Sequence, residues 1–140
     1  MLMRLPVLAA MVLVSASSAF AAEGGCHVVS GTYVNQNVLC PVPALACVES
    51  TSTVSGGWGQ DATALFIITG FDPVTQVFTG TGTSTLESGA VLTTTISGTL
   101  AKGSVQTLTG GTRQYAHTTG SIVSDGAGNF VAEYCFSNAG

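Results

Sequence analysis

From residue 22 onward the chain is rich in Thr, Ser, Gly and Val, and no window shows a helical period of useful length. Threonine and valine branch at the β-carbon, which makes them stiff and suits them to a pleated sheet. Glycines recur at short intervals, as they do in antiparallel meanders with many tight turns. The sequence therefore predicts an all-β domain.

About eight strands of modest length are expected along this segment. The clearest is the apolar run 64–69, which suits a strand buried on both faces. After it, Asp72-Pro73-Val74-Thr75 has the residues of a tight turn. The segments predicted as strands are 28–34, 48–54, 64–69, 76–81, 81–86, 91–100, 105–109 and 129–136.

This number of short strands favours a closed antiparallel barrel. Closure removes the unpaired edges that a Thr-rich sheet would otherwise present, and a β-sandwich is the alternative. In the last predicted strand, Phe130, Ala132, Tyr134 and Phe136 alternate onto one face. We expect that aromatic face to point into the core.

The first 21 residues have the features of a cleavable signal peptide. Arg4 gives a positive start, residues 5–14 are apolar, and Ala19-Phe20-Ala21 suits a cleavage site. The apolar run is well short of the ~20 residues that cross a bilayer. A lipid anchor at Cys26 is the alternative, although Glu23 stands where such a site wants an apolar residue. We therefore expect residues 1–21 to be removed and residues 22–140 to form one secreted or periplasmic barrel domain.

All four cysteines follow the predicted cleavage site. An even number in an exported chain indicates disulfides, and the absence of a Cys-x-x-Cys pair argues against zinc. Three pairings are possible. We favour Cys40–Cys47, which closes a short loop with two prolines, together with Cys26–Cys135, which ties the first strand to the last.

Charged side chains are scarce, and after residue 21 only Lys102 and Arg113 are cationic, against seven Asp and Glu. Phosphate binding needs Lys and Arg, so the composition argues against a nucleic-acid partner and against anionic membrane surfaces. His27 and His117 lack the spaced partners of a metal site. Residues 125–129 suit a hairpin turn better than a calcium loop. No metal and no cofactor are expected.

The segment 110–120, Gly-Gly-Thr-Arg-Gln-Tyr-Ala-His-Thr-Thr-Gly, resembles a motif of many small secreted bacterial proteins, roughly Gly-Gly-Thr-Gly-Arg-Phe-Ala-Gly-Ala-Thr-Gly. A related Gly-Gly-Thr-Gly pattern occurs in plant dirigent proteins, which share an eight-stranded antiparallel barrel with allene oxide cyclases. Residues 79–86 and 94–100 also resemble the strands before that motif. The resemblance covers about residues 75–136 and implies the barrel fold.

The sequence departs from this pattern at several positions. Arg113 replaces the third glycine of the motif, Gln114 stands at the position of its arginine, and His117 replaces another glycine. An arginine displaced by one position on an extended segment points to the opposite face. The resemblance therefore implies no role for Arg113, whereas Tyr115 matches the aromatic position.

Several polar and aromatic residues are candidates for a ligand site. Arg113, Tyr115 and His117 alternate, so on a strand they would share one face and could form a polar cluster with a carboxylate such as Glu87 or Glu133. The alternative is that they decorate a surface loop. Two further aromatics complete the set of candidates, which is Trp58, Glu87, Arg113, Tyr115, His117 and Tyr134. Trp58 could also plug one end of the barrel.

Three functions are compatible with these features. The first is a barrel that binds, or steers the reaction of, a small hydrophobic molecule without strong catalysis. The second is a cyclase or isomerase that uses the barrel pocket, which the resemblance allows. The third is a structural or interaction module at the cell surface. The sequence leaves the ligand and the oligomeric state open.

The pairs Thr79-x-Thr81, Thr93-x-Thr95 and Thr107-x-Thr109 recur at a constant spacing. Stacked threonine pairs resemble the flat faces of ice-binding solenoids, but a solenoid would repeat along most of the chain. Consecutive antiparallel strands are not expected to align such pairs, so the sequence argues against an ice-binding face.

Overall fold

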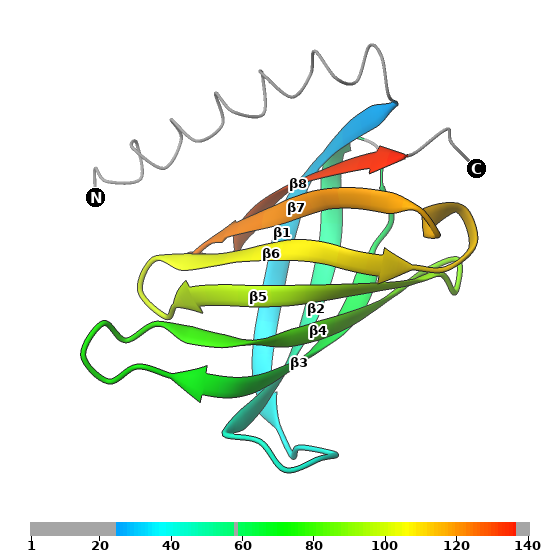
Figure 1. The fold of residues 1–140 in the computed structure, drawn as a ribbon. Coiled ribbons are helices and arrows are strands. Elements are labelled where there is room, and N and C mark those ends of the chain that lie inside the picture. The colour runs from blue at the N-terminus through cyan, green and yellow to red at the C-terminus, as the bar shows by residue number, and fades with distance from the viewer. Residues whose placement is uncertain (1–24, 58, 137–140) are drawn as a thin grey trace.

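The computed structural model describes residues 25–57 and 59–136, and these form one closed antiparallel barrel (Figure 1). Each strand pairs with the next along the chain, and the last pairs with the first. The strands are β1 (Cys26–Val38), β2 (Ala46–Gly57), β3 (Ala62–Phe71), β4 (Phe78–Leu86), β5 (Val91–Thr99), β6 (Gly103–Gly111), β7 (Thr118–Asp125) and β8 (Asn129–Phe136). This architecture confirms the predicted all-β barrel over the sandwich.

One short 3-10 helix, η1 (Arg113–Tyr115), lies between β6 and β7. Within the described residues, no helix is long and apolar enough to cross a membrane.

The number of strands was predicted correctly, but two of the individual assignments were wrong. Residues 76–81 and 81–86 form the single strand β4, whereas β7 was not predicted at all. The β7 segment begins inside the glycine-rich motif at residues 110–120 and contains Gly120 in a left-handed conformation with φ 146°. A Cβ on Gly120 would lie 1.9 Å from the backbone oxygen of Glu133 on β8, so this strand requires a glycine that weakens its sequence signal.

Side chains alternate between the barrel interior and the solvent along every strand. On β8, Phe130, Ala132 and Tyr134 are buried inside, as predicted. On β4 the inward position 82 is a glycine because the Phe66 ring of β3 occupies that space. A Cβ there would come within 2.5 Å of the ring.

A cluster of buried side chains fills one end of the barrel, which we call the floor. The turn between β4 and β5 and the helix η1 close this end. Tyr115 of η1 is 1 % exposed, and its ring packs edge-on against Tyr134, with the ring centroids 5.9 Å apart. The buried members of the floor are Val29, Leu86, Ala90, Leu92, Leu108, Tyr115, Phe130, Ala132 and Tyr134.

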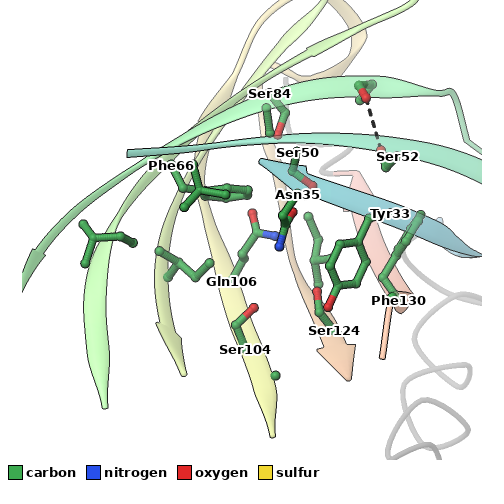
Figure 2. Close-up of a pocket in the computed structure, with 18 of the residues that line it drawn as sticks. Tyr33, Asn35, Ser50, Ser52, Phe66, Ser84, Ser104, Gln106, Ser124 and Phe130 are labelled. Atoms are coloured by element: carbon green, nitrogen blue, oxygen red, sulfur yellow. Dashed lines mark hydrogen bonds between the residues drawn. The ribbon is translucent and has the colours of Figure 1, made fainter. Parts of the chain in front are cut away.

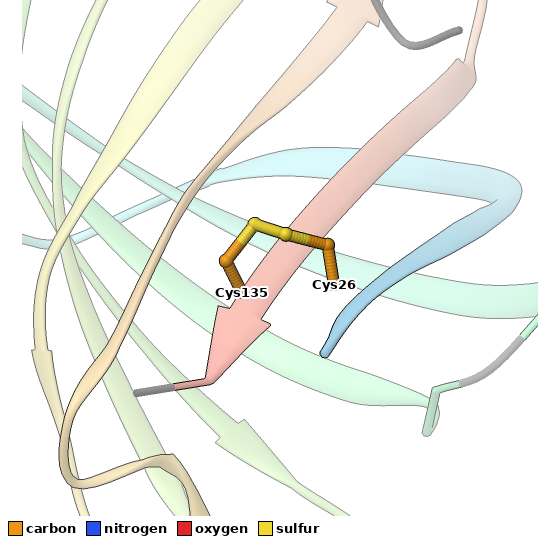
Figure 3. The surroundings of a disulfide bond; sticks show 2 residues. All are labelled: Cys26 and Cys135. Atoms are coloured by element: carbon orange, nitrogen blue, oxygen red, sulfur yellow. A yellow bond between two sulfur atoms is a disulfide. The ribbon is translucent and has the colours of Figure 1, made fainter. Parts of the chain in front are cut away.

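Two disulfides staple the barrel, and they are the two favoured from sequence. Cys26 on β1 lies directly opposite Cys135 on β8, so this bond crosses the seam where the barrel closes (Figure 3). Cys40 and Cys47 close the loop between β1 and β2. The first bond links residues 109 apart in sequence and the second links residues 7 apart.

The outer wall of β4, β5 and β6 carries threonines in register. One row runs across the three strands through Thr81, Thr95 and Thr107. In the next row the hydroxyl of Thr109 donates a hydrogen bond to that of Thr93 at 3.1 Å. The expectation that antiparallel strands would not align these residues is therefore wrong. The rows nevertheless follow a closed, twisted barrel wall and do not form the flat face of a solenoid.

Candidate functional site

The barrel encloses a cavity of about 450 Å³ above the floor. The cavity opens at the end of the barrel opposite η1, between the loops that join β1 to β2, β3 to β4, β5 to β6 and β7 to β8. Phe71 and Leu100 line it there and are 53 % and 90 % exposed. A volume of this size falls in the range of small-molecule sites.

Much of the cavity lining is apolar. Phe66 and Ile96 pack together on the wall of β3 and β5. Leu86, Leu92 and Phe130 belong both to the floor and to the cavity lining. A ligand in contact with these side chains would exchange water for aliphatic and aromatic carbon, which favours binding of an apolar body.

Neutral polar side chains from four strands line the cavity, and we call them the polar belt (Figure 2). Its members are Tyr33, Asn35, Asn37, Ser50, Ser52, Ser104, Gln106 and Ser124. Asn35 on β1 and Ser50 on β2 are paired across the two strands, and Ser104 on β6 is paired with Ser124 on β7. Figure 2 shows the Gln106 side chain of β6 extending into the space between these two walls. The belt therefore offers amide and hydroxyl groups from opposite sides of the cavity.

Two of the polar groups inside the barrel are held by hydrogen bonds. The Thr94 hydroxyl donates to the amide oxygen of Gln106 at 3.1 Å, which leaves the Gln106 amide nitrogen directed at the cavity. Near the open end, the Tyr33 hydroxyl donates to the backbone oxygen of Asp125 at 3.0 Å. These bonds fix two side chains before any ligand enters, which lowers the entropy lost on binding.

No charged side chain and no histidine is among the described residues that line the cavity. A charged ligand would lose its hydration there without meeting a counter-charge, which is costly in a low-dielectric interior. The lining therefore selects for a neutral molecule with an apolar body and a few oxygen or nitrogen groups.

The two tyrosines of the lining remain protonated near neutral pH. Burial raises the pKa of Tyr134 to about 12, with a smaller contribution from the nearby phenol of Tyr115. Burial also raises the pKa of Tyr33, and the charge of Asp125 adds to this shift, whereas a hydrogen bond with the backbone of Gly128 opposes it. Both phenols are therefore neutral hydrogen-bonding groups.

The residues that the sequence suggested as a ligand site do not lie together in the structure. Tyr134 lines the cavity, whereas Tyr115 lies in the floor on the far side of it. Glu87, Arg113 and His117 are exposed near the closed end and do not line the cavity. Trp58 lies outside the described residues.

The prediction that Arg113, Tyr115 and His117 share one strand face is wrong. Arg113 to Tyr115 form η1, and Arg113 has a positive φ of 57°. The Arg113 guanidinium donates to the backbone oxygen of Ser88 in the β4–β5 turn, so it staples two loops of the closed end. Tyr115 turns inward, and burial raises its pKa while a hydrogen bond with Gln60 lowers it.

Sequence reasoning missed the polar belt. Its members alternate with outward residues, as in Tyr33-x-Asn35-x-Asn37 on β1 and Ser50-x-Ser52 on β2. The outward positions of these strands also carry polar residues such as Thr51, so hydrophobicity does not distinguish the two faces. The pairing of these strands with a neighbour whose buried face is evident from its sequence, such as β3, was the remaining signal for which residues point inward.

The described residues offer one group of potential metal ligands, and it does not suit a metal. The side chains of Cys26, Glu133 and Cys135 lie within 4.8 Å of one another, but the two sulfurs are bonded to each other. The Asp125 carboxylate is engaged in its own turn, where it accepts from the backbone amides of Ala127 at 2.8 Å and Asn129 at 2.9 Å. This geometry is that of a hairpin turn and not of a calcium loop.

Comparison with known proteins found no match to any protein-family model and no match among curated proteins.

Proposed function

We propose that this protein binds a small neutral molecule, largely hydrophobic, in the cavity of its barrel. The observation that carries the proposal is the combination of apolar lining residues, uncharged polar groups and an opening at one end. An apolar wall supplies the binding free energy, and a few placed polar groups fix the orientation of the ligand. The resemblance to barrel proteins of the dirigent and allene oxide cyclase type is compatible with this function.

We propose binding or steering of the ligand without strong catalysis. The enzyme hypothesis relied on Glu87, Arg113, Tyr115 and His117, and none of the four lines the cavity. The groups that do line it are amides, hydroxyls and phenols, which hydrogen-bond to a ligand but exchange protons poorly near neutral pH.

We further propose that the chain is exported and that the barrel is the mature protein. Both disulfides of the described residues are of the kind that persists in oxidising compartments. The predicted signal peptide, residues 1–21, lies outside the described residues.

The first test is a fluorescence titration with N-phenyl-1-naphthylamine, a neutral apolar probe. We expect saturable binding to the wild-type protein. Ser50→Phe places a ring in the cavity and should weaken probe binding at least about tenfold, since it removes the space for the ligand. Thr51→Phe, on the outer face of the same strand, is the matched control and should bind the probe like the wild type.

Ser104→Phe on β6 gives a second obstruction of the cavity, with Val105→Phe as its outward control. Thermal unfolding followed by circular dichroism verifies that each variant is folded. Equal probe binding by all four variants and the wild type would refute the cavity as the binding site. Native mass spectrometry of the protein from its natural source would then reveal whether a bound molecule of other chemistry accompanies it.

A further inference from the structure

The exposed large apolar side chains of this barrel gather at its open end. Eight such side chains are exposed in the described part of the chain. Val34 and Val105 are exposed on the outer walls of β1 and β6, outside the loops of the mouth. The other six, which we call the apolar rim, are Leu39, Val42, Leu45, Phe71, Val74 and Leu100.

The loop between β1 and β2 holds half of the apolar rim away from the barrel. Leu39 is 95 % exposed and Leu45 is 64 % exposed. The disulfide between Cys40 and Cys47 closes this loop and two prolines stiffen it, so its aliphatic side chains cannot readily fold back. Figure 1 shows the loop projecting from the barrel below the β3–β4 hairpin.

The apolar rim is continuous with the cavity. Phe71 and Leu100 belong to both, because they line the opening and also face solvent. At the mouth, the apolar rim therefore leads into the same cavity that Phe66 and Phe130 line. Exposed apolar surface grouped around a binding cavity marks an interaction site.

The charges near the mouth leave little for electrostatic docking. The Asp72 carboxylate accepts from the backbone amide of Val74 at 2.8 Å and stabilises its own turn. Asp125 is used in the same way in the β7–β8 turn. Four loops surround the mouth, and they join β1 to β2, β3 to β4, β5 to β6 and β7 to β8. Lys102 in the β5–β6 turn is the single cationic side chain of these loops, so the mouth has no cluster of basic residues.

We propose that the apolar rim docks this protein on the surface of a zwitterionic lipid bilayer with no net charge, with the cavity mouth facing the acyl region. The rim consists of separate projecting loops, which suits insertion into a soft interface better than the fit of two rigid protein surfaces. A lipid surface also supplies neutral apolar molecules directly to the mouth, whereas a second copy would seal it. The delivery of a ligand from the lipid to the cavity rests on the proposed function, whereas the docking itself does not.

The test is co-flotation of the full mature protein with vesicles of pure phosphatidylcholine. We expect the protein to float with the vesicles. The bound fraction should change little between about 0.05 and 0.5 M salt, a range over which salt increasingly screens interactions between surface charges. Leu39→Ser, Leu45→Ser and Val74→Ser combined change exposed rim residues that do not line the cavity, and should lower the partition coefficient at least about tenfold. Val34→Ser and Val105→Ser combined remove exposed apolar side chains from the outer wall of the barrel, outside the mouth loops, and should leave the partition coefficient unchanged.

Three outcomes would overturn the proposal. The first is that the wild-type protein does not float with the vesicles. The second is that the rim and control variants lose flotation equally. The third is that light scattering shows a dimer of the wild-type protein that the rim variant does not form. Ser50→Phe separates this proposal from the proposed function, because it should lose the fluorescent probe and still float. The rim variant should float poorly and still bind the probe.

Discussion

The Thr94 hydroxyl donates a hydrogen bond to the amide oxygen of Gln106 between the neighbouring strands β5 and β6. Both side chains are buried, at 2 % and 7 % exposure. The bond satisfies a buried hydroxyl and points the amide nitrogen of Gln106 into the cavity. The same contact therefore stabilises the barrel and prepares a donor for the ligand.

We expect Gln106→Leu to lower the free energy of unfolding by about 1–3 kcal/mol, because it leaves the Thr94 hydroxyl buried without its acceptor. Thr94→Val combined with Gln106→Leu removes both polar groups and should recover most of this loss. Urea unfolding of the two single variants and the double variant measures the coupling. Simple additivity of the two losses would contradict a shared hydrogen bond.

The ring of Tyr115 is expected to be structural and not part of the ligand site. Tyr115→Ala should cost about 3–5 kcal/mol of stability, since it opens a hole in the floor. Tyr115→Phe keeps the ring, loses the contact with Gln60 and should cost about 1 kcal/mol. Probe affinity of Tyr115→Phe should equal that of the wild type. A loss of affinity without a loss of stability would place Tyr115 in the binding site.

Much of the barrel was predictable because its strands carry local signals. The apolar run 64–69 lies within β3, the aromatic face of β8 points inward, and the favoured disulfides join strands that the topology brings together. The resemblance at residues 110–120 supported the same fold. These features depend on residue type and on spacing along one strand, which a sequence displays directly.

The site was not predictable from the same signals. Asn35 and Gln106 stand on strands far apart in sequence, and only the closure of the barrel brings them to one cavity. Arg113 and His117 have the side chains of a catalytic group, yet the chain enters η1 between β6 and β7 and leaves both exposed. The position of a residue around the barrel therefore predicts whether it lines the cavity better than the chemical type of its side chain does.

The two disulfides should differ in their contribution to stability. In the chain-entropy model, a crosslink over 109 residues contributes about 4.8 kcal/mol and one over 7 residues about 2.4 kcal/mol. We therefore expect the pair Cys26→Ala and Cys135→Ala to lower the free energy of unfolding more than Cys40→Ala and Cys47→Ala. Urea unfolding under non-reducing conditions measures both losses. The reverse order would show that the β1–β2 loop, and not the seam, limits the stability of the barrel.

The buried phenol of Tyr134 should make the barrel unfold more easily in alkali. Its pKa is about 12 in the folded protein, against 10.0 as the ordinary value, so the folded state retains this proton at a pH where the unfolded chain loses it. The resulting stability is complete below pH 10 and is lost as the pH rises toward about 12. A shift of this size is worth about 2–3 kcal/mol. Tyr115, whose pKa is also raised, adds to the effect in the same direction.

Urea unfolding between about pH 9 and pH 11.5 checks this dependence, with phenolate absorbance recorded in the same samples. Tyr134→Phe removes the group that titrates and keeps the ring, so its stability should fall less steeply over this interval. His117→Ala, an exposed change near the closed end, is the control and should follow the wild-type slope. If Tyr134→Phe and the wild type lose stability in parallel, the proton held by the folded state belongs to another group, and Tyr115→Phe is the variant that should then flatten the curve.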